Sequence, residues 1–182
     1  MYGEITPIGF RKLAERLQLA NSDRFVDLGS GLGRVVIQAA REFGVQSSCG
    51  VELAGSRHEI AMAALGRESC DTLHNVTFLC ADCTDPVLWF GNSVGDGCLC
   101  GITVIYVCSI MFGPELMESL ARLIEATPSV RAVASVRHWP GGLMGFVGDE
   151  LPEHYETSWT APSTLDQPSN EEGTPIHIYV RR

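Results

Sequence analysis

The fold of this chain follows from residues 24–34, which read Arg-Phe-Val-Asp-Leu-Gly-Ser-Gly-Leu-Gly-Arg. Residues 24–28 are rich in strand-forming side chains, and the glycines after them let the backbone turn tightly and approach a ligand closely. Residues 34–43 then have the composition of a helix that ends at Gly44. A glycine-rich turn between a strand and a helix also occurs without a ligand, but in this context the motif predicts a binding site.

On both sides of this unit the chain alternates between strand-like and helix-like segments. Further strands are predicted at 48–53, 75–80, 102–107 and 131–136, and helices at 5–19, 56–68 and 114–126. Such alternation favours a parallel sheet. Two later strand-like segments, 154–160 and 176–180, enclose an exposed loop rich in Pro, Ser, Asn and Glu at 162–174. We therefore expect an α/β fold with a doubly wound, mostly parallel seven-stranded sheet and a C-terminal antiparallel hairpin.

The length of 182 residues predicts a single domain, since domains typically run to about 100–200 residues. We divide it into an N-terminal loop and helix at 1–22, ligand-binding βα units at 23–136, and a C-terminal loop and hairpin at 137–182. No apolar run approaches the ~18 residues of a membrane span. The first residues do not combine a basic region with an apolar stretch, so we expect no membrane association and no secretion.

The chain is acidic, with 13 Lys and Arg against 22 Asp and Glu and a net charge of −9. Binding to a phosphate backbone needs clustered cations, so we expect no direct contact with nucleic acid. Lys12 is the lone lysine.

The seven cysteines predict free thiols. Most of them lie in or beside apolar segments, where a free cysteine acts as a small hydrophobe. Cys80-x-x-Cys83 and Cys98-x-Cys100 resemble halves of a zinc site, but no Cys/His pair has the matching spacing. We therefore expect no metal and an intracellular protein.

Acidic residues stand at the ends of three successive predicted strands, namely Asp27, Glu52 and Asp82. Open α/β sheets bind ligands at this edge, where a carboxylate can accept the hydroxyls of a ribose. A nicotinamide dinucleotide is the main alternative, but its fingerprint has a sixth-place glycine where this chain has Arg34, and its pyrophosphate would meet Asp27. A ligand that joins an α-amino acid to a ribose and carries no phosphate fits these strand-end acids better. The sequence thus predicts S-adenosyl-L-methionine as the cofactor and a Rossmann-like class I methyltransferase sheet.

Four segments together resemble the disruptor-of-telomeric-silencing family of non-SET histone-lysine methyltransferases. They are Tyr2-Gly3-Glu4, residues 25–38, Gly50-Val51-Glu52 and Phe112-Gly113-Pro114-Glu115. The resemblance runs from Tyr2 to about Val136. The first and last of these segments are far more specific than the glycine motif, which by itself indicates only the superfamily.

The resemblance implies roles for individual residues. Glu4 would lie in a loop that closes over the methionine end of the cofactor, which Asp27 and the glycine turn would hold. Glu52 would bind the ribose and Asp82 the adenine. The full set of cofactor-binding residues implied in this way is Tyr2, Glu4, Asp27, Gly29, Gly31, Gln38, Glu52, Asp82 and Cys83.

The resemblance also implies where the methyl group would be transferred. Phe112 would line the channel for the lysine, and the expected catalytic set is Cys108, Ser109, Phe112 and Tyr179. The chain departs from the family pattern here. Cys108-Ser109 replaces two asparagines, Cys83 replaces an aromatic residue, and Tyr179 lies beside the position of a hairpin tyrosine. Trp159 is a further candidate for the channel.

Taken together, the sequence predicts an S-adenosylmethionine-dependent protein-lysine N-methyltransferase. By the resemblance, its partner would be a histone within a nucleosome and its location the nucleus. The alternative is a class I methyltransferase that acts on a non-histone protein lysine or a small molecule, with a cytoplasmic location. A third possibility is a binding module that keeps the cofactor site without catalysis.

Overall fold

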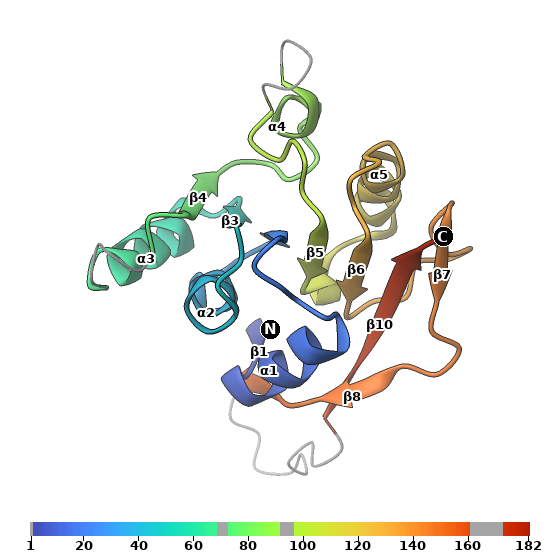
Figure 1. Cartoon of the computed structure of the whole chain (residues 1–182), viewed down its shortest axis with the longest axis horizontal. Coiled ribbons are helices and arrows are strands. Elements are labelled where there is room, and N and C mark those ends of the chain that lie inside the picture. Colours follow the sequence, from blue (N-terminus) through green and yellow to red (C-terminus); the bar gives the residue numbers. More distant parts are fainter. Residues whose placement is uncertain (1, 69–72, 92–96, 161–172) are drawn as a thin grey trace.

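The computed structural model describes residues 2–68, 73–91, 97–160 and 173–182, with only the backbone of Tyr2, Gly3, Trp159 and Thr160. A central sheet runs through the molecule in the order β4-β3-β2-β5-β6-β10-β7 (Figure 1). The strands of this path are β2 (Arg24–Leu28), β3 (Ser47–Glu52), β4 (Val76–Cys80), β5 (Val104–Val107), β6 (Ala132–Ser135), β7 (Phe146–Gly148) and β10 (Thr174–Arg181). In the described part of the chain, an eighth strand joins the same sheet by pairing with β10.

The first five strands of this order are parallel, and β10 and β7 are antiparallel to their neighbours. The chain builds outward from β2 through β3 to β4, and then returns to the other side of β2 with β5 and β6. The order therefore reverses between β2 and β5, and open α/β sheets bind ligands at the carboxyl ends of such strands. The structure confirms the predicted mostly parallel α/β fold.

Helices cover both faces of the sheet. Helix α1 (Pro7–Arg16) and α2 (Arg34–Phe43) pack on one face, where Phe10 and Leu13 meet the buried side of the strands. Helix α4 (Pro86–Phe90) and α5 (Pro114–Glu125) pack on the other, with Trp89 and Leu120 in the core. Helix α3 (Gly55–Leu65) lies beside α2 and β4 at one end of the sheet (Figure 1). Strands covered on both faces explain the continuous apolar runs of the sequence.

The last third of the chain differs from the prediction. The expected strand at 154–160 is two strands, β8 (Glu153–Tyr155) and β9 (Thr157–Thr160). Of these two, β8 pairs with β10, whereas β9 pairs with β1 (Tyr2–Ile5). The short strand β7, which the sequence analysis did not predict, also lies in this part of the chain. The predicted loop at 162–174 lies almost entirely outside the described residues.

No helix in the described part of the chain has both the length and the apolar character needed to cross a membrane.

Candidate ligand pocket

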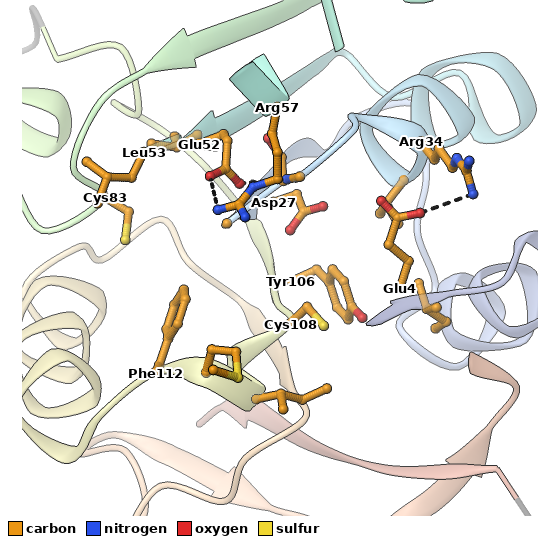
Figure 2. Close-up of a pocket in the computed structure, with 18 of the residues that line it drawn as sticks. Glu4, Asp27, Arg34, Glu52, Leu53, Arg57, Cys83, Tyr106, Cys108 and Phe112 are labelled. Atoms are coloured by element: carbon orange, nitrogen blue, oxygen red, sulfur yellow. Dashed lines mark hydrogen bonds and ion pairs between the residues drawn. The ribbon is translucent and has the colours of Figure 1, made fainter. Parts of the chain in front are cut away.

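A pocket of about 470 Å³ opens at the carboxyl ends of β2, β3 and β5 (Figure 2). It brings together most of the residues that the sequence predicted for a ligand. Its lining includes Glu4, Asp27, Gly29, Gly31, Glu52, Asp82, Cys83, Cys108 and Phe112. Residues that are far apart in the sequence converge here because the parallel strands end at one edge.

The glycine turn forms the floor of this pocket. Gly29, Gly31 and Gly33 all have positive φ values, of 85°, 53° and 77°. A side chain at Gly33 would place a Cβ 2.4 Å from Cζ of Phe78, so only glycine fits under α2. A Cβ on Gly29 would come within 3.1 Å of Cζ of Phe112. The turn therefore brings backbone, rather than side chains, to the ligand.

Glu52 is held firmly at the end of β3. Its Oε2 accepts a hydrogen bond from the Gly31 N–H at 2.9 Å, and its Oε1 accepts from Ala54 N–H at 2.8 Å and from Arg57 Nη2 at 2.6 Å. Burial opposes ionisation of this carboxyl, but the three donors, led by Arg57, lower its pKa. Glu52 is therefore a fixed carboxylate at the pocket wall.

Asp27 is the buried acid at the centre of the pocket. Its residue is 3% exposed, and its Oδ1 has no hydrogen-bond partner among the described residues. Burial raises its pKa well above the usual value, and the nearby charges of Glu4 and Glu52 raise it further. An unpaired buried carboxyl among acids is costly, so this position favours a cationic ligand.

Glu4 reaches the pocket from β1, which is held in place by its pairing with β9. Its carboxylate forms an ion pair with Nη1 of Arg34 at 3.2 Å. Arg34 begins α2, whose N-cap Gly33 offers no side-chain hydrogen bond, and Arg34 and Val35 of its first turn line the pocket. Together they place a cation and backbone N–H groups beside the acidic cluster.

Asp82 and Cys83 lie on the side of the pocket formed after β4. Asp82 Oδ1 accepts from the backbone N–H and the hydroxyl of Thr84, which lower its pKa. Burial raises the pKa of the Cys83 thiol to about 11, so it stays neutral. Leu53, 71% exposed, completes an apolar rim here.

The opposite side of the pocket is formed by the segment after β5. Cys108, Ile110, Met111 and Phe112 line it, together with Tyr106 from the end of the strand. Burial raises the pKa of the Cys108 thiol to about 12, with Asp27 as the next cause. Cys108 therefore presents a neutral, weakly polar group and not a base.

Three predicted site residues lie outside the pocket. Gln38 Nε2 donates to the carbonyl of Pro7 at 2.9 Å and so joins α2 to the start of α1. The Ser109 hydroxyl is buried 2.9 Å from that of Ser135 and accepts the Arg137 N–H. The Tyr179 hydroxyl accepts the Trp139 N–H in the core. The polar group of each of these three side chains forms its hydrogen bond with a structural neighbour and not with the pocket.

The side chains of Tyr2 and Trp159 lie outside what the structure describes. Among described residues, no three His, Cys, Asp or Glu side chains gather as metal ligands.

Sequence reasoning did not predict Arg34, Arg57 and Tyr106 as residues that line the pocket. Tyr106 was hidden within an apolar strand, where a tyrosine resembles core packing. The signal that could have identified Tyr106 is its position near the end of β5, directly opposite Asp27 in β2. Arg57 follows Glu52 by five residues, a spacing that only the β3–α3 turn converts into contact.

Comparison with known proteins agrees with this geometry. A family model described as "Histone methylation protein DOT1" matches residues 1–135. A histone H3 lysine-79 specific N-methyltransferase of Candida albicans is 46% identical over 52 residues, covering 29% of this chain and 4% of that protein. The corresponding Kluyveromyces lactis protein is 37% identical over 73 residues, covering 39% and 13%. The chain thus matches only a small part of these longer relatives.

Solved structures share the fold. The methyltransferase domain of bacterial CtHen1 has a TM-score of 0.64 at 12% identity, covering 98% of this chain and 99% of that one. An RNA methyltransferase from Salinibacter ruber, solved with S-adenosyl-L-homocysteine, has a TM-score of 0.55 at 20% identity and covers 93% and 86%. At these identities the likeness concerns the Rossmann-like fold. Because the family model spans 135 of the 182 residues and the glycine turn and strand-end acids stand in one pocket, this chain belongs to the family of the histone methylation protein DOT1.

Proposed function

We propose that the pocket binds S-adenosyl-L-methionine and that the chain transfers the methyl group to a lysine of a nucleosomal histone. The observation that carries this proposal is Asp27, a buried carboxyl without a partner on Oδ1, placed between Glu4 and Glu52. Such a cluster of acidic side chains favours a positively charged ligand. The donor supplies it twice, through its ammonium and its sulfonium.

The remaining lining matches the other parts of the donor. Arg34 and the N-terminus of α2 suit the α-carboxylate, because a helix N-terminus favours an anion. Glu52 is a fixed acceptor for ribose hydroxyls. Leu53 and Cys83 offer apolar surface to the adenine, with Asp82 at its edge. The volume of about 470 Å³ falls within the ~300–1,000 Å³ of small-molecule sites.

The acceptor side explains how the chain assists transfer. When bound, the donor supplies an activated methyl group on a cationic sulfur. A lysine amine must be neutral to attack it, although its ordinary pKa is near 10.4. Ile110, Met111 and Phe112 form an apolar wall that disfavours the ammonium form. The protein therefore works by alignment and desolvation, without a base, since the Cys108 thiol stays neutral.

Membership of this family supports a nuclear histone as the acceptor. Its named relatives are H3 lysine-79 specific enzymes. The net charge of −9 suits a basic protein surface and not the DNA of the nucleosome. The alternative acceptor is a non-histone protein lysine or a small molecule. The thiol of Cys108 in the pocket, where the family pattern has an asparagine, favours this second candidate.

Incubation with labelled donor tests the proposal, with nucleosomes, free histones and a cell extract as acceptors. Since Lys12 is the lone lysine, the variant Lys12→Arg removes the chain's own lysine acceptor and serves as the enzyme in every arm. Label on histone H3 of nucleosomes supports the proposal. Label confined to other extract components supports the second candidate. Donor binding without transfer to any acceptor contradicts both.

A further inference from the structure

The segment that follows β5 forms one wall of the pocket but has little regular structure of its own. A 3₁₀ turn covers Ser109–Met111 and is closed by a hydrogen bond from the Phe112 N–H to the Ser109 carbonyl at 3.0 Å. Such short turns have poor hydrogen-bond geometry. Ile110, Met111 and Phe112 nevertheless line the pocket. The position of this wall therefore depends on contacts from other parts of the fold.

The residues that follow β6 supply these contacts. The Val136 N–H donates to the Val107 carbonyl at 3.2 Å and so continues the pairing of β6 with β5. Arg137 comes next and binds the wall at two points. Its backbone N–H donates to the buried Ser109 hydroxyl at 2.9 Å, and its Nη1 donates to the Phe112 carbonyl at 2.7 Å. One residue thus holds both ends of the wall segment.

The guanidinium of Arg137 differs from those of the two arginines in the pocket lining. Arg34 and Arg57 form ion pairs with Glu4 and Glu52. Among the residues that the structure describes, Arg137 forms no ion pair, and its exposed side chain bonds to a backbone carbonyl instead. A hydrogen bond from a charged donor is stronger than one between neutral groups, so it restrains the backbone of the wall effectively.

The Phe112 side chain carries this restraint into the pocket. Figure 2 shows its ring pointing into the pocket. The end of the ring lies over the glycine turn, because a Cβ on Gly29 would come within 3.1 Å of the Phe112 Cζ. The backbone position of Phe112 therefore sets where the apolar wall meets the surface that we assign to the donor.

We propose that Arg137 is a positioning residue for methyl transfer, because its guanidinium fixes the wall that aligns the acceptor amine with the donor. The inference rests on the proposed function, since it requires that this pocket methylates an amine. It deepens that function, because Arg137 lies outside the pocket lining and would still control the rate.

The chemistry of the transfer explains why the position of the wall matters. The nitrogen lone pair forms a bond to the methyl carbon, while the electrons of the broken carbon–sulfur bond remain on sulfur. The product ammonium then loses a proton to solvent. Nitrogen, carbon and sulfur must lie nearly in line, and a displacement of about 1 Å costs on the order of a hundredfold in rate.

Arg137→Met removes the hydrogen-bond donor and keeps an aliphatic side chain. The backbone N–H still reaches Ser109, so we expect the variant to fold. Its kcat should fall at least about tenfold. The KM for the donor and the calorimetric affinity for S-adenosyl-L-homocysteine should stay within about threefold of wild type, because the donor-facing residues are unchanged. Arg137→Lys keeps a cationic donor and should be at least about threefold faster than Arg137→Met.

The kinetics use the full chain, labelled donor and nucleosomes. Arg122→Met is the matched control, because it makes the same replacement at an exposed arginine of α5 that pairs with Glu118. It should leave kcat and donor affinity unchanged. Hydrogen exchange measured by mass spectrometry reports on the wall without requiring activity. The amides of residues 110–112 should exchange at least about tenfold faster in Arg137→Met, and at the wild-type rate in Arg122→Met.

The outcomes separate the two proposals. Wild-type protein that methylates no acceptor overturns the proposed function, and this inference with it. If wild type is active, an unchanged kcat or unchanged exchange in Arg137→Met overturns the inference alone. So does a loss of donor affinity as large as the loss of kcat, since Arg137 would then support the donor site as a whole. Arg137→Lys that is as slow as Arg137→Met also contradicts it.

Discussion

Arg57 Nη2 lies 2.6 Å from Oε1 of Glu52, and both residues line the pocket, where we propose that Glu52 binds the ribose of the donor. A carboxylate offers about four lone-pair sites. Arg57, Ala54 and Gly31 already fill three of them on Glu52. A ribose presents two hydroxyl donors, so binding of both requires Arg57 to move.

Arg57→Ala should therefore strengthen binding of S-adenosyl-L-homocysteine, by up to about fivefold, because the Arg57 side chain is 44% exposed and solvent keeps its ion pair to about 1 kcal/mol. Calorimetric titration measures the change. Arg122→Ala, which removes an exposed arginine of α5 paired with Glu118, should have no effect. A weaker affinity in Arg57→Ala would mean that Arg57 orients Glu52 for the ribose instead of competing with it.

Asp27 makes the stability of the ligand-free protein depend on pH. Its pKa is raised in the folded protein, so the native state holds a proton that the unfolded chain has lost above about pH 4. The stabilisation is present at low pH and falls as pH rises through the folded pKa. Asparagine has no titratable proton at this position. The melting temperature of Asp27→Asn should therefore exceed that of wild type by a difference that grows from pH 5 to pH 8. A pH-independent difference between the two melting curves would contradict the shift.

The glycine turn supplies a paired test of packing. Gly33→Ala places a Cβ against Phe78, whereas Gly44→Ala, at the other end of α2, meets nothing within 4 Å. Both glycines have positive φ, so both variants carry the backbone cost of about 1 kcal/mol. Gly33→Ala should lose about 1–3 kcal/mol more in denaturant unfolding. Equal losses in the two variants would show that the Phe78 side chain moves aside without a loss of stability.

Ser109 tests the difference between a catalytic and a structural role. Ser109→Ala leaves the Ser135 hydroxyl and the Arg137 N–H without their shared partner, at an expected cost of about 1–3 kcal/mol in stability. Affinity for S-adenosyl-L-homocysteine should stay as in wild type. Loss of methyl transfer with unchanged stability would restore Ser109 to the catalytic set.

The first two-thirds of the fold could be predicted because local signals and tertiary packing agree there. Strand 24–28 and helix 34–43 have the predicted bounds, since glycines delimit them and the strand is buried on both faces. The C-terminal part could not be predicted in the same way. Whether residues 157–160 pair with β10 or with β1 depends on contacts across the whole chain. No local pattern encodes that choice.

The site residues also divide into those that local sequence signals predict and those whose position depends on tertiary contacts. Acids at strand ends were predictable, because parallel strands bring their carboxyl ends together, and Asp27 and Glu52 line one pocket. Ser109, Gln38 and Tyr179 were assigned to the site by the family resemblance. Their orientation depends on hydrogen bonds to Ser135, Pro7 and Trp139, partners that only the folded chain brings near.

Calorimetric titration of wild-type protein and Asp27→Asn at pH 8 tests the central claim most directly. We predict that wild type binds S-adenosyl-L-methionine and that the variant, which remains folded, binds it at least about a hundredfold more weakly, as expected for loss of a buried charge partner worth ~3–5 kcal/mol. Equal affinity in the two proteins, or no heat with S-adenosyl-L-methionine but binding of a nicotinamide dinucleotide, would contradict the account.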